Sequence, residues 1–380
     1  MTAEETGRTG LVWGRSAWAG SQRYPGQWGG DPQTSVEAMA ATLRGGLSYA
    51  LSAPGIWSHD IGGFYGPPPS PALYIRWAQF GLLSPLARAH GTTPREPWEF
   101  GSEALEIFRE FARLRYRLLP YLLHCAREAA VQGLPMLRPL LLEFPDDPGV
   151  VTIDDQYLLG SSLLVAPVFS DSEQPVTRSL YLPSGGWYDW WTGEPLEGGR
   201  YLKERVPLNR VPLYMRAGSA LPVGAPAAWV ADRVDAENIT LFSPLRGAST
   251  VDLLIEGGSD SRSASFEGRG LVPRRPAPEV RAAAGDEPPP YASDLRNDVL
   301  GDSTSESTLG VTRVSQYRTE RDLEVEMAGL PATVRSLSVR GLPSDSQAFV
   351  DGQRVSTSWD GKELSLSLAH GGEVKLQLRW

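Results

Sequence analysis

The first 157 residues alternate between short apolar runs and longer stretches in which apolar residues recur every three or four positions. The longer stretches have the spacing of amphipathic helices. The short runs are typical of strands buried on both faces, and a strand–helix rhythm favours a parallel sheet. The pattern predicts helices at 35–51, 71–83 and 102–132, and strands at 11–15, 55–64, 85–91 and 135–144.

Local signals mark where these helices begin and end. Ser35 can cap the first helix, and Pro71 suits the first turn of the second. Pro120 lies inside the third helix and should kink it, because proline lacks the N–H that a helix interior needs. Gly133 is the expected stop.

The pattern changes near Tyr157, where short strands separated by turns replace the helices. The predicted fold class is therefore α/β plus all-β, with a parallel α/β part at 1–157 and two β-sandwich domains at 158–222 and 223–380. Proximal strands are expected within 161–169, 177–193 and 211–223, and distal strands at 239–244, 249–257, 336–343, 347–355, 363–370 and 373–380. Residues 268–308 are rich in proline, glycine, serine and charge, which predicts a disordered loop. The aromatic stretch 188–194 is expected to form sandwich core or an interdomain contact.

Composition narrows the function classes. The net charge is −9 with acids and bases intermixed, so no basic face predicts a nucleic-acid partner. No run of about 18 apolar residues predicts a membrane span. Cys125 is the only cysteine, which excludes an internal disulfide and favours a cytoplasmic location, although a disulfide-free secreted protein also fits.

Other reaction classes lack their motifs. Four histidines and one cysteine are scattered without zinc-site spacing. The chain has neither a nucleotide P-loop, nor a Gly-x-Gly-x-x-Gly after a strand, nor a Gly-x-Ser-x-Gly elbow.

Asp31 is the first candidate for chemistry. It follows Gly29 and Gly30, whose bare backbone lets a bulky ligand approach, and Trp28 can shield the carboxyl from water. A shielded carboxyl suits a general acid. The same residues are also compatible with an aspartate that merely starts a Gly-Asp-Pro turn.

Further polar residues follow the other predicted strands. Asp60 precedes a glycine pair and can either bind ligand hydroxyls or cap a loop, whereas His59 should point to the opposite face of the strand. His90 can donate to a ligand or be a structural histidine. Arg15 ends the first strand and needs a carboxylate partner if it is buried, which suggests Asp31 or Asp60. In a (β/α)8 barrel such positions form the rim of the active site.

Several strings together resemble glycoside hydrolase family 31, whose members cleave α-linked sugars with retention. They are "RSAWAGSQRYPGQWGGD", "LRGGLS", "WSHDIGGF", "HGTTPREPW", "LRYRLLPYL", "LLGSSLLVAPV" and "GGWYDWWTGE", and the resemblance runs from about Leu11 to Pro222. It implies the C-terminal half of a (β/α)8 TIM barrel followed by proximal and distal β-sandwiches.

The resemblance also implies functional roles. Asp31 would be the general acid/base, and the terminal sugar would lie among Arg15, Trp28, Asp60, Phe64 and His90. The substrate would be an α-linked oligosaccharide or glycoside, most simply an α-xyloside or α-glucoside. No metal or organic cofactor is implied, because carboxylates and water suffice for both half-reactions.

One part of the family pattern is missing. The nucleophilic aspartate should precede the acid/base residue, and no segment of these 380 residues matches its motif. Three explanations stay open: a truncated or split protein, a separate polypeptide that supplies the other half-barrel, or a degenerate homologue that binds sugar without cleaving it. Exposed strand edges would also invite association, including homo-oligomers. We expect the isolated chain to have little or no glycosidase activity.

Overall fold

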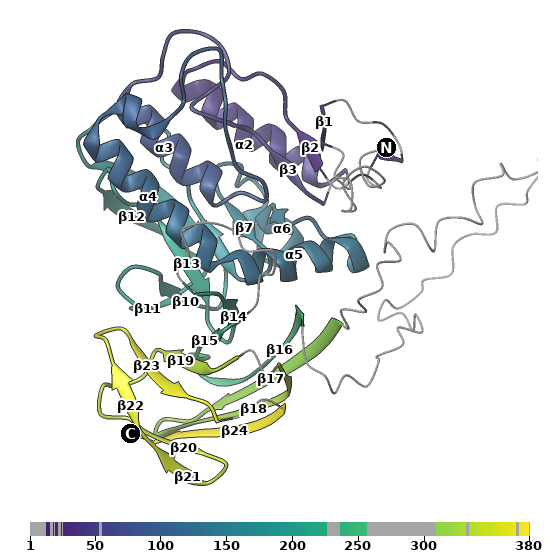
Figure 1. The fold of residues 1–380 in the computed structure, drawn as a ribbon, viewed down its shortest axis with the longest axis vertical. Helices are drawn as coiled ribbons and strands as arrows, with labels where there is room; N and C mark the ends of the chain where they lie inside the picture. The colour runs from purple at the N-terminus through teal and green to yellow at the C-terminus, as the bar shows by residue number, and fades with distance from the viewer. Residues whose placement is uncertain are drawn as a thin grey trace, which may run out of the picture.

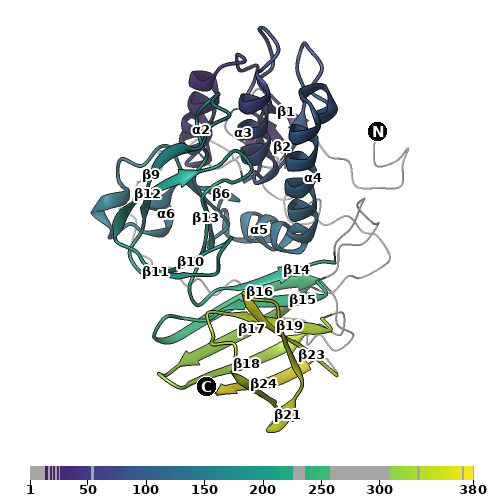
Figure 2. The same ribbon diagram turned by 90° about the vertical axis from the view of Figure 1, so that its left-hand side faces the viewer.

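The computed structural model describes residues 13–15, 18, 20–21, 24, 26–52, 55–225, 236–256, 309–331, 334–369 and 372–379. Three parts follow one another along the long axis of the molecule (Figure 1). The helices lie together at one end, a small β-rich part lies in the middle, and a two-sheet part lies at the other end (Figure 2). The predicted loop at 268–308 lies outside the described residues.

The α/β part is built on short parallel strands. These are β1 (Trp13–Gly14), β2 (Gly26–Trp28), β3 (Trp57–Ser58), β4 (Asp60–Ile61) and β5 (Arg88–Ala89). β1, β2 and β3 pair in that order, and β4 pairs with β5. Because only His59 separates β3 from β4, the chain makes four successive parallel strands. The sequence missed β2, which is three residues long.

The helices form where the sequence predicts them. They are α2 (Val36–Ala50), α3 (Pro71–Leu82), α4 (Ser102–Arg117) and α5 (Leu119–Gln132). The Ser35 hydroxyl accepts from the Ala38 N–H at 3.1 Å, which confirms the cap. The third predicted helix breaks at Leu118, two residues before Pro120, and Gly133 ends it in the left-handed conformation. Short 3₁₀ turns lie at η2 (Pro97–Phe100) and η3 (Pro148–Val150).

The middle part contains a six-stranded sheet in the order β11-β10-β13-β8-β7-β6 and a two-stranded ribbon of β9 and β12. Its strands are β6 (Leu137–Arg138), β7 (Tyr157–Leu159), β8 (Leu163–Val165), β9 (Val176–Leu182), β10 (Gly186–Asp189), β11 (Pro195–Glu197), β12 (Arg200–Val206) and β13 (Leu213–Arg216). The prediction for 135–144 was wrong, because β6 pairs antiparallel with β7 and the chain then turns into the helix α6 (Leu140–Glu143). The predicted boundary at 157 therefore cuts through this sheet.

The distal part consists of two sheets, β14-β15-β19-β23-β22 and β16-β17-β18-β24-β20-β21. Their strands are β14 (Ala220–Val223), β15 (Asn238–Phe242), β16 (Gly247–Glu256), β17 (Leu309–Arg318), β18 (Asp322–Leu330), β19 (Ser336–Arg340), β20 (Gln347–Val350), β21 (Gln353–Val355), β22 (Thr357–Trp359), β23 (Glu363–Ser367) and β24 (Gly372–Arg379). β14 was predicted as proximal but pairs with β15, so the predicted boundary at 222 falls within the first strand of the distal part. β17 and β18 were missed.

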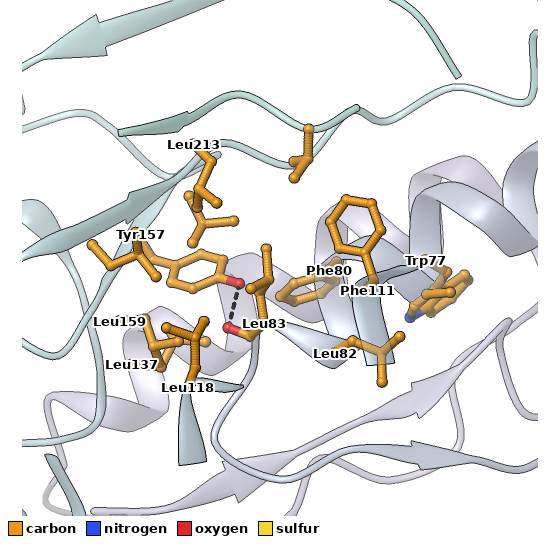
Figure 3. Packing of buried hydrophobic residues seen from close by; sticks show 14 of the residues in the cluster. Trp77, Phe80, Leu82, Leu83, Phe111, Leu118, Leu137, Tyr157, Leu159 and Leu213 are labelled. Carbon is orange, nitrogen blue, oxygen red and sulfur yellow. Dashed lines mark hydrogen bonds between the residues drawn. The ribbon is translucent and has the colours of Figure 1, made fainter. Parts of the chain in front are cut away.

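The α/β and middle parts share one hydrophobic core (Figure 3). Trp77 and Phe80 of α3, Phe111 of α4 and Leu213 of β13 all belong to this cluster, in which Leu213 lies next to Tyr157. The Tyr157 hydroxyl donates to the Leu83 carbonyl at 2.9 Å, which satisfies a buried polar group at the centre of this core. The two parts therefore fold as one unit.

The aromatic stretch 188–194 joins the middle part to the distal part, as the sequence predicted. The buried Tyr188 hydroxyl donates to the Ser243 carbonyl at 2.8 Å. Arg340 of β19 reaches back and donates to the Trp190 carbonyl at 3.1 Å. Trp191 instead points to the α/β side, where its ring lies 5.9 Å from that of Phe111.

A buried guanidinium ties α3 to the loop between β12 and β13. Arg76 is 1% exposed, and its Nη1 donates to the carbonyls of Pro207 at 3.0 Å and Arg210 at 2.8 Å. Its Nη2 donates to the Val206 carbonyl at 3.3 Å, and the neighbouring Gln79 amide reaches the Leu208 carbonyl at 2.7 Å. Burial lowers the pKa of Arg76 to about 10, so the group stays charged at neutral pH.

We predict that Arg76→Met destabilises the chain by about 2–4 kcal/mol, because several buried carbonyls lose their donors. The midpoint of urea unfolding, followed by tryptophan fluorescence, measures the change. Arg109→Met is the matched control, since Arg109 is exposed on α4 and pairs only with Glu106, and should change stability by about 0.5 kcal/mol or less. Equal midpoints for the two variants would contradict a stabilising role of the Arg76 hydrogen bonds.

Candidate active site

The carboxyl ends of the parallel strands bring the predicted site residues to one side of the α/β part. Arg15 follows β1, Asp31 follows β2, Asp60 lies in β4, and His90 follows β5. Parallel strands present their carboxyl ends at the same edge, which is why residues far apart in sequence meet there.

Asp31 stands on a glycine that its neighbours require. Gly30 has a φ of +92°, a region that L side chains rarely adopt, and an added Cβ would lie 3.4 Å from the Arg15 side chain. Arg15 Nη1 lies 3.3 Å from Asp31 Oδ2, so the predicted pairing is confirmed. Asp31 Oδ1 is buried and has no hydrogen-bond partner among the described residues. The Arg15 guanidinium lies over the Trp28 ring at 5.1 Å.

Asp60 is fully buried and pairs with an arginine that the sequence analysis did not select. Arg88 Nε and Nη2 both donate to Asp60 Oδ1, at 2.8 and 2.6 Å. The same guanidinium lies 4.6 Å from the centre of the Trp13 ring and 4.7 Å from that of Trp28. The missed signal is spacing: Arg88 stands two residues before His90 on an extended segment and therefore faces the same side.

Opposing effects act on the Asp60 carboxyl. Burial raises its pKa, and the hydrogen bond and charge of Arg88, together with the charge of His90, oppose that rise. The negative charge of Asp31 raises the pKa further. The two carboxyl groups are therefore close enough to influence each other, and they belong to one site.

Backbone hydrogen bonds join the loops that carry these residues. The Phe64 N–H donates to the Pro32 carbonyl at 2.7 Å, and the Thr92 N–H donates to the Phe64 carbonyl at 2.7 Å. The buried Arg95 guanidinium donates to the Gly63 carbonyl from Nη2 at 2.8 Å and from Nε at 3.0 Å. A Cβ at Gly63 would come within 2.8 Å of the neighbouring backbone, so this loop needs glycine there. The arrangement holds the Phe64 and His90 rings 5.4 Å apart.

His59 faces away from this site, as predicted from the alternation of the strand. Its Nδ1 accepts from Trp77 Nε1 at 3.1 Å, and its ring stacks on Phe80 at 4.0 Å. Its Nε2 lies 3.2 Å from the Ser84 hydroxyl. Burial lowers the pKa of His59 to about 3, so the imidazole is neutral and structural.

A cavity of about 480 Å³ opens beside Asp31, where Arg15 and Trp28 also line it, and extends along α2 to Trp57 and His59. Asp60, Phe64 and His90 are not among its lining residues. Five buried polar atoms at the strand ends have no partner among the described residues: Trp28 Nε1, Asp31 Oδ1, Trp57 Nε1, Ser58 Oγ and Asp60 Oδ2. Buried polar atoms normally have partners, so these atoms suit a ligand with several hydroxyl groups. Ser58 was not predicted, although it stands two residues before Asp60 and shares its face.

The tryptophans of the α/β part have different surroundings. Trp77 is fully buried in the core, Trp57 is buried and borders the cavity, and Trp13 and Trp28 lie against Arg88. In the described part of the chain no group of three or more histidine, cysteine, aspartate or glutamate residues is placed to hold a metal ion. None of the described helices combines the length and apolarity needed to cross a membrane.

Comparison with known families gives two matches. The model of the glycosyl hydrolases family 31 TIM-barrel domain matches residues 1–125, and the model of the glycosyl hydrolase family 31 C-terminal domain matches residues 133–221. Together they account for more than half of the chain.

Individual proteins agree with these matches. An alpha-xylosidase of Emericella nidulans is 43% identical over 232 residues, covering 59% of this chain and 29% of the relative. Alpha-glucosidase 2 of Bacillus thermoamyloliquefaciens is 36% identical over 213 residues, covering 55% of this chain and 27% of the relative. The chain thus spans less than a third of the length of these curated relatives.

A solved structure supports the fold. A Flavobacterium johnsoniae dextranase in complex with isomaltotriose superposes with a TM-score of 0.75 at 24% identity. The match covers 96% of this chain and 45% of the dextranase. The order of a barrel portion followed by β domains is therefore shared along nearly the whole chain.

The buried histidines predict loss of stability in mild acid. The pKa of His59 is lowered from 6.5 to about 3, so its contribution is present above pH 6.5 and lost as the pH falls toward 3. A neutral His59 also accepts from Trp77, and protonation removes that acceptor. We expect stability to fall by about 2 kcal/mol per buried histidine between pH 7 and pH 5.

Urea unfolding at the two pH values tests this assignment. His59→Gln and His124→Gln should each remove about 2 kcal/mol of the loss of stability between pH 7 and pH 5, because burial also lowers the pKa of His124, to about 4. If His59→Gln changed stability equally at both pH values, without altering the difference between them, the neutral assignment would be wrong.

Proposed function

Because the chain belongs to glycoside hydrolase family 31, we propose that it carries the acid/base half of a retaining α-glycosidase site. The observation that carries the proposal is Asp31, held on the Gly30 turn beside Arg15 with one carboxylate oxygen left unpartnered. Asp60 and Arg88 form the second polar group of the same site.

The barrel needs strands from outside this chain. The described part has four successive parallel strands, and an eight-stranded barrel cannot close with four. We propose that this part is the C-terminal half of a (β/α)8 barrel, and that a preceding half-barrel contributes the other strands and the nucleophilic carboxylate. β1 and β5 are the edges at which that half would pair.

The proposed reaction has two steps. Asp31 donates a proton through Oδ1 to the glycosidic oxygen while the nucleophilic carboxylate attacks the anomeric carbon and forms a glycosyl-enzyme. Asp31 then accepts a proton from the water that hydrolyses this intermediate. The contact of Arg15 with Oδ2 leaves Oδ1 free for both proton transfers.

The terminal sugar would lie between the carboxylates and the aromatic residues. Asp60 Oδ2 has no partner among the described residues and can accept from a sugar hydroxyl, while Arg88 fixes Oδ1. Trp28 presents an unpartnered indole N–H to the same region. The rings of Phe64 and His90 lie at the outer side of the site, where His90 is exposed.

The substrate class is an α-xyloside or α-glucoside at a non-reducing end. The higher identity to the Emericella nidulans alpha-xylosidase than to the Bacillus alpha-glucosidase supports the xyloside. A cytoplasmic location is proposed with it, on the single buried cysteine. The alternative is a binding protein without turnover, which the missing nucleophile motif favours.

We predict that the isolated chain does not measurably hydrolyse p-nitrophenyl α-xyloside or α-glucoside. Turnover should appear when the chain is joined to a half-barrel that carries the nucleophile, because only then do both carboxylates flank the bond. Release of p-nitrophenol measures both forms. Normal turnover by the isolated chain would overturn the half-site proposal, and a joined protein that binds but never cleaves would support the alternative.

In the joined enzyme, Asp31→Ala should lower kcat on substrates with poor leaving groups by about 10²–10⁴-fold. A dinitrophenyl glycoside should lose much less, since its leaving group needs no protonation, and azide should restore turnover by taking the place of water. Asp154→Ala is the matched control, because Asp154 is exposed and pairs only with Arg44 among the described contacts. Equal losses on both substrate types would remove Asp31 from the acid/base role.

A further inference from the structure

We propose that the outer face of the distal six-stranded sheet is a second, non-catalytic site that binds a neutral oligosaccharide. This face has a hollow of about 470 Å³ over β16, β17, β18, β24 and β20, here called the distal groove. Its lining includes Tyr317, Glu324, Phe349, Lys375 and Gln377. The β18–β24 sheet lies at the end of the molecule remote from the helices (Figure 1).

Strand register places the central groove residues in one line across the sheet. Tyr317 of β17 is opposite Glu324 of β18, Glu324 is opposite Gln377 of β24, and Gln377 is opposite Phe349 of β20. Residues next to them in sequence, such as Val325, are buried between the two sheets. Because side chains alternate along a strand, all four members of the line point outward into the groove.

The two rings lie at the ends of this line. Tyr317, near the end of β17, is 52% exposed. Three strand spacings separate β17 from β20, so the backbones at the rings are roughly 14 Å apart. A single sugar ring cannot touch both aromatic residues, and the fitting ligand is a chain of several pyranoses whose C–H faces stack on the rings.

The polar side chains between the rings are already joined to one another. Gln377 Nε2 donates to Glu324 Oε1 at 3.2 Å, and Arg379 Nη2 donates to Gln377 Oε1 at 2.8 Å. Arg379 also lies over the Phe349 ring at 5.4 Å. The carboxylate and amide keep further lone pairs for ligand hydroxyls, in a line that a rigid sheet holds fixed.

The charged side chains around the groove are already paired with one another, which disfavours an ionic ligand. Lys375 Nζ lies 3.0 Å from Glu326 Oε1, and Arg379 Nε lies 3.6 Å from Asp322 Oδ1. An acidic or basic ligand would have to compete with these pairs, whereas a neutral polyhydroxylated chain would not. The groove therefore complements a neutral glycan in charge, in hydrogen-bonding groups and in apolar contacts.

The groove is on a different domain from Asp31, so its occupation does not require the catalytic site. The geometry of the groove identifies its ligand as a neutral chain of pyranoses. That the chain is α-linked rests on the proposed function. A bound polysaccharide would be held near the enzyme while its ends are processed.

Calorimetric titration of the 380-residue chain tests the groove. The probes are maltohexaose, isomaltohexaose and a xyloglucan heptasaccharide, with glucose and xylose as single-ring comparisons. We expect at least one oligosaccharide to bind at least tenfold more tightly than either monosaccharide. Binding should weaken at least tenfold in both Tyr317→Thr and Phe349→Thr, which keep strand propensity but remove the rings.

Matched variants separate the groove from other effects. Tyr317→Phe and Phe349→Tyr keep a ring and should keep binding, and Tyr201→Thr removes an exposed ring of β12 and should leave binding unchanged. Gln377→Ala gives an independent test if a threonine variant does not fold. Asp31→Ala should retain oligosaccharide binding, so failure of the glycosidase proposal and failure of this one give different results.

Three outcomes would overturn the proposal. None of the oligosaccharides binds, or the loss of both rings leaves affinity unchanged. The third is concentration-dependent dimerisation in sedimentation that Tyr317→Thr abolishes, which would show that a second copy covers this face.

Discussion

Guanidinium groups that donate to backbone carbonyls hold this chain together where loops have to be fixed. Arg76 binds the loop between β12 and β13, and Arg115 of α4 donates to the Leu82 carbonyl at 2.9 Å and the Pro85 carbonyl at 2.7 Å. Arginine suits this task because it stays charged and carries five donors in a planar fork. Arg76 fixes α3 against the loop before β13, and Arg115 fixes the C-terminal end of α3 against α4, so the parallel strands rest on a core that includes β13.

An arginine that donates to backbone carbonyls also fixes the geometry of the site. Arg95 donates to Gly63 and holds the turn after β4 against the segment that follows His90. The same turn donates to the backbone next to Asp31, from the Phe64 N–H to the Pro32 carbonyl. The site residues of three strands are thus coupled inside this chain, and the half-site keeps its shape through contacts among described residues. In the proposed function the remaining group is a second carboxylate, because Asp31, Arg15 and the buried Asp60 are already positioned by this chain.

The sequence predicted the helices and their ends well, since caps, Pro120 and Gly133 are local signals. It failed where pairing decides the outcome. β6 has the composition of a parallel strand, yet it pairs antiparallel with β7, which follows only after α6 and η3. β2 is too short to show a period. β18 alternates, with Leu323 and Val325 inward, and was not predicted.

The residues of the site divide in the same way, into those with a signal in the sequence and those whose role depends on strand pairing. Asp31, Asp60 and His90 were found because motifs of a known family contain them, and Arg15 because a charge at a strand end needs a partner. Arg88 and Ser58 were not found, since their roles depend on which residue lies opposite on the next strand. Asp60 shows why strand pairing matters. A buried carboxylate is stable only with a paired cation, so the site needs Arg88 as much as it needs Asp60. A motif therefore identifies the reacting groups, and the strand register identifies the groups that allow them to be buried.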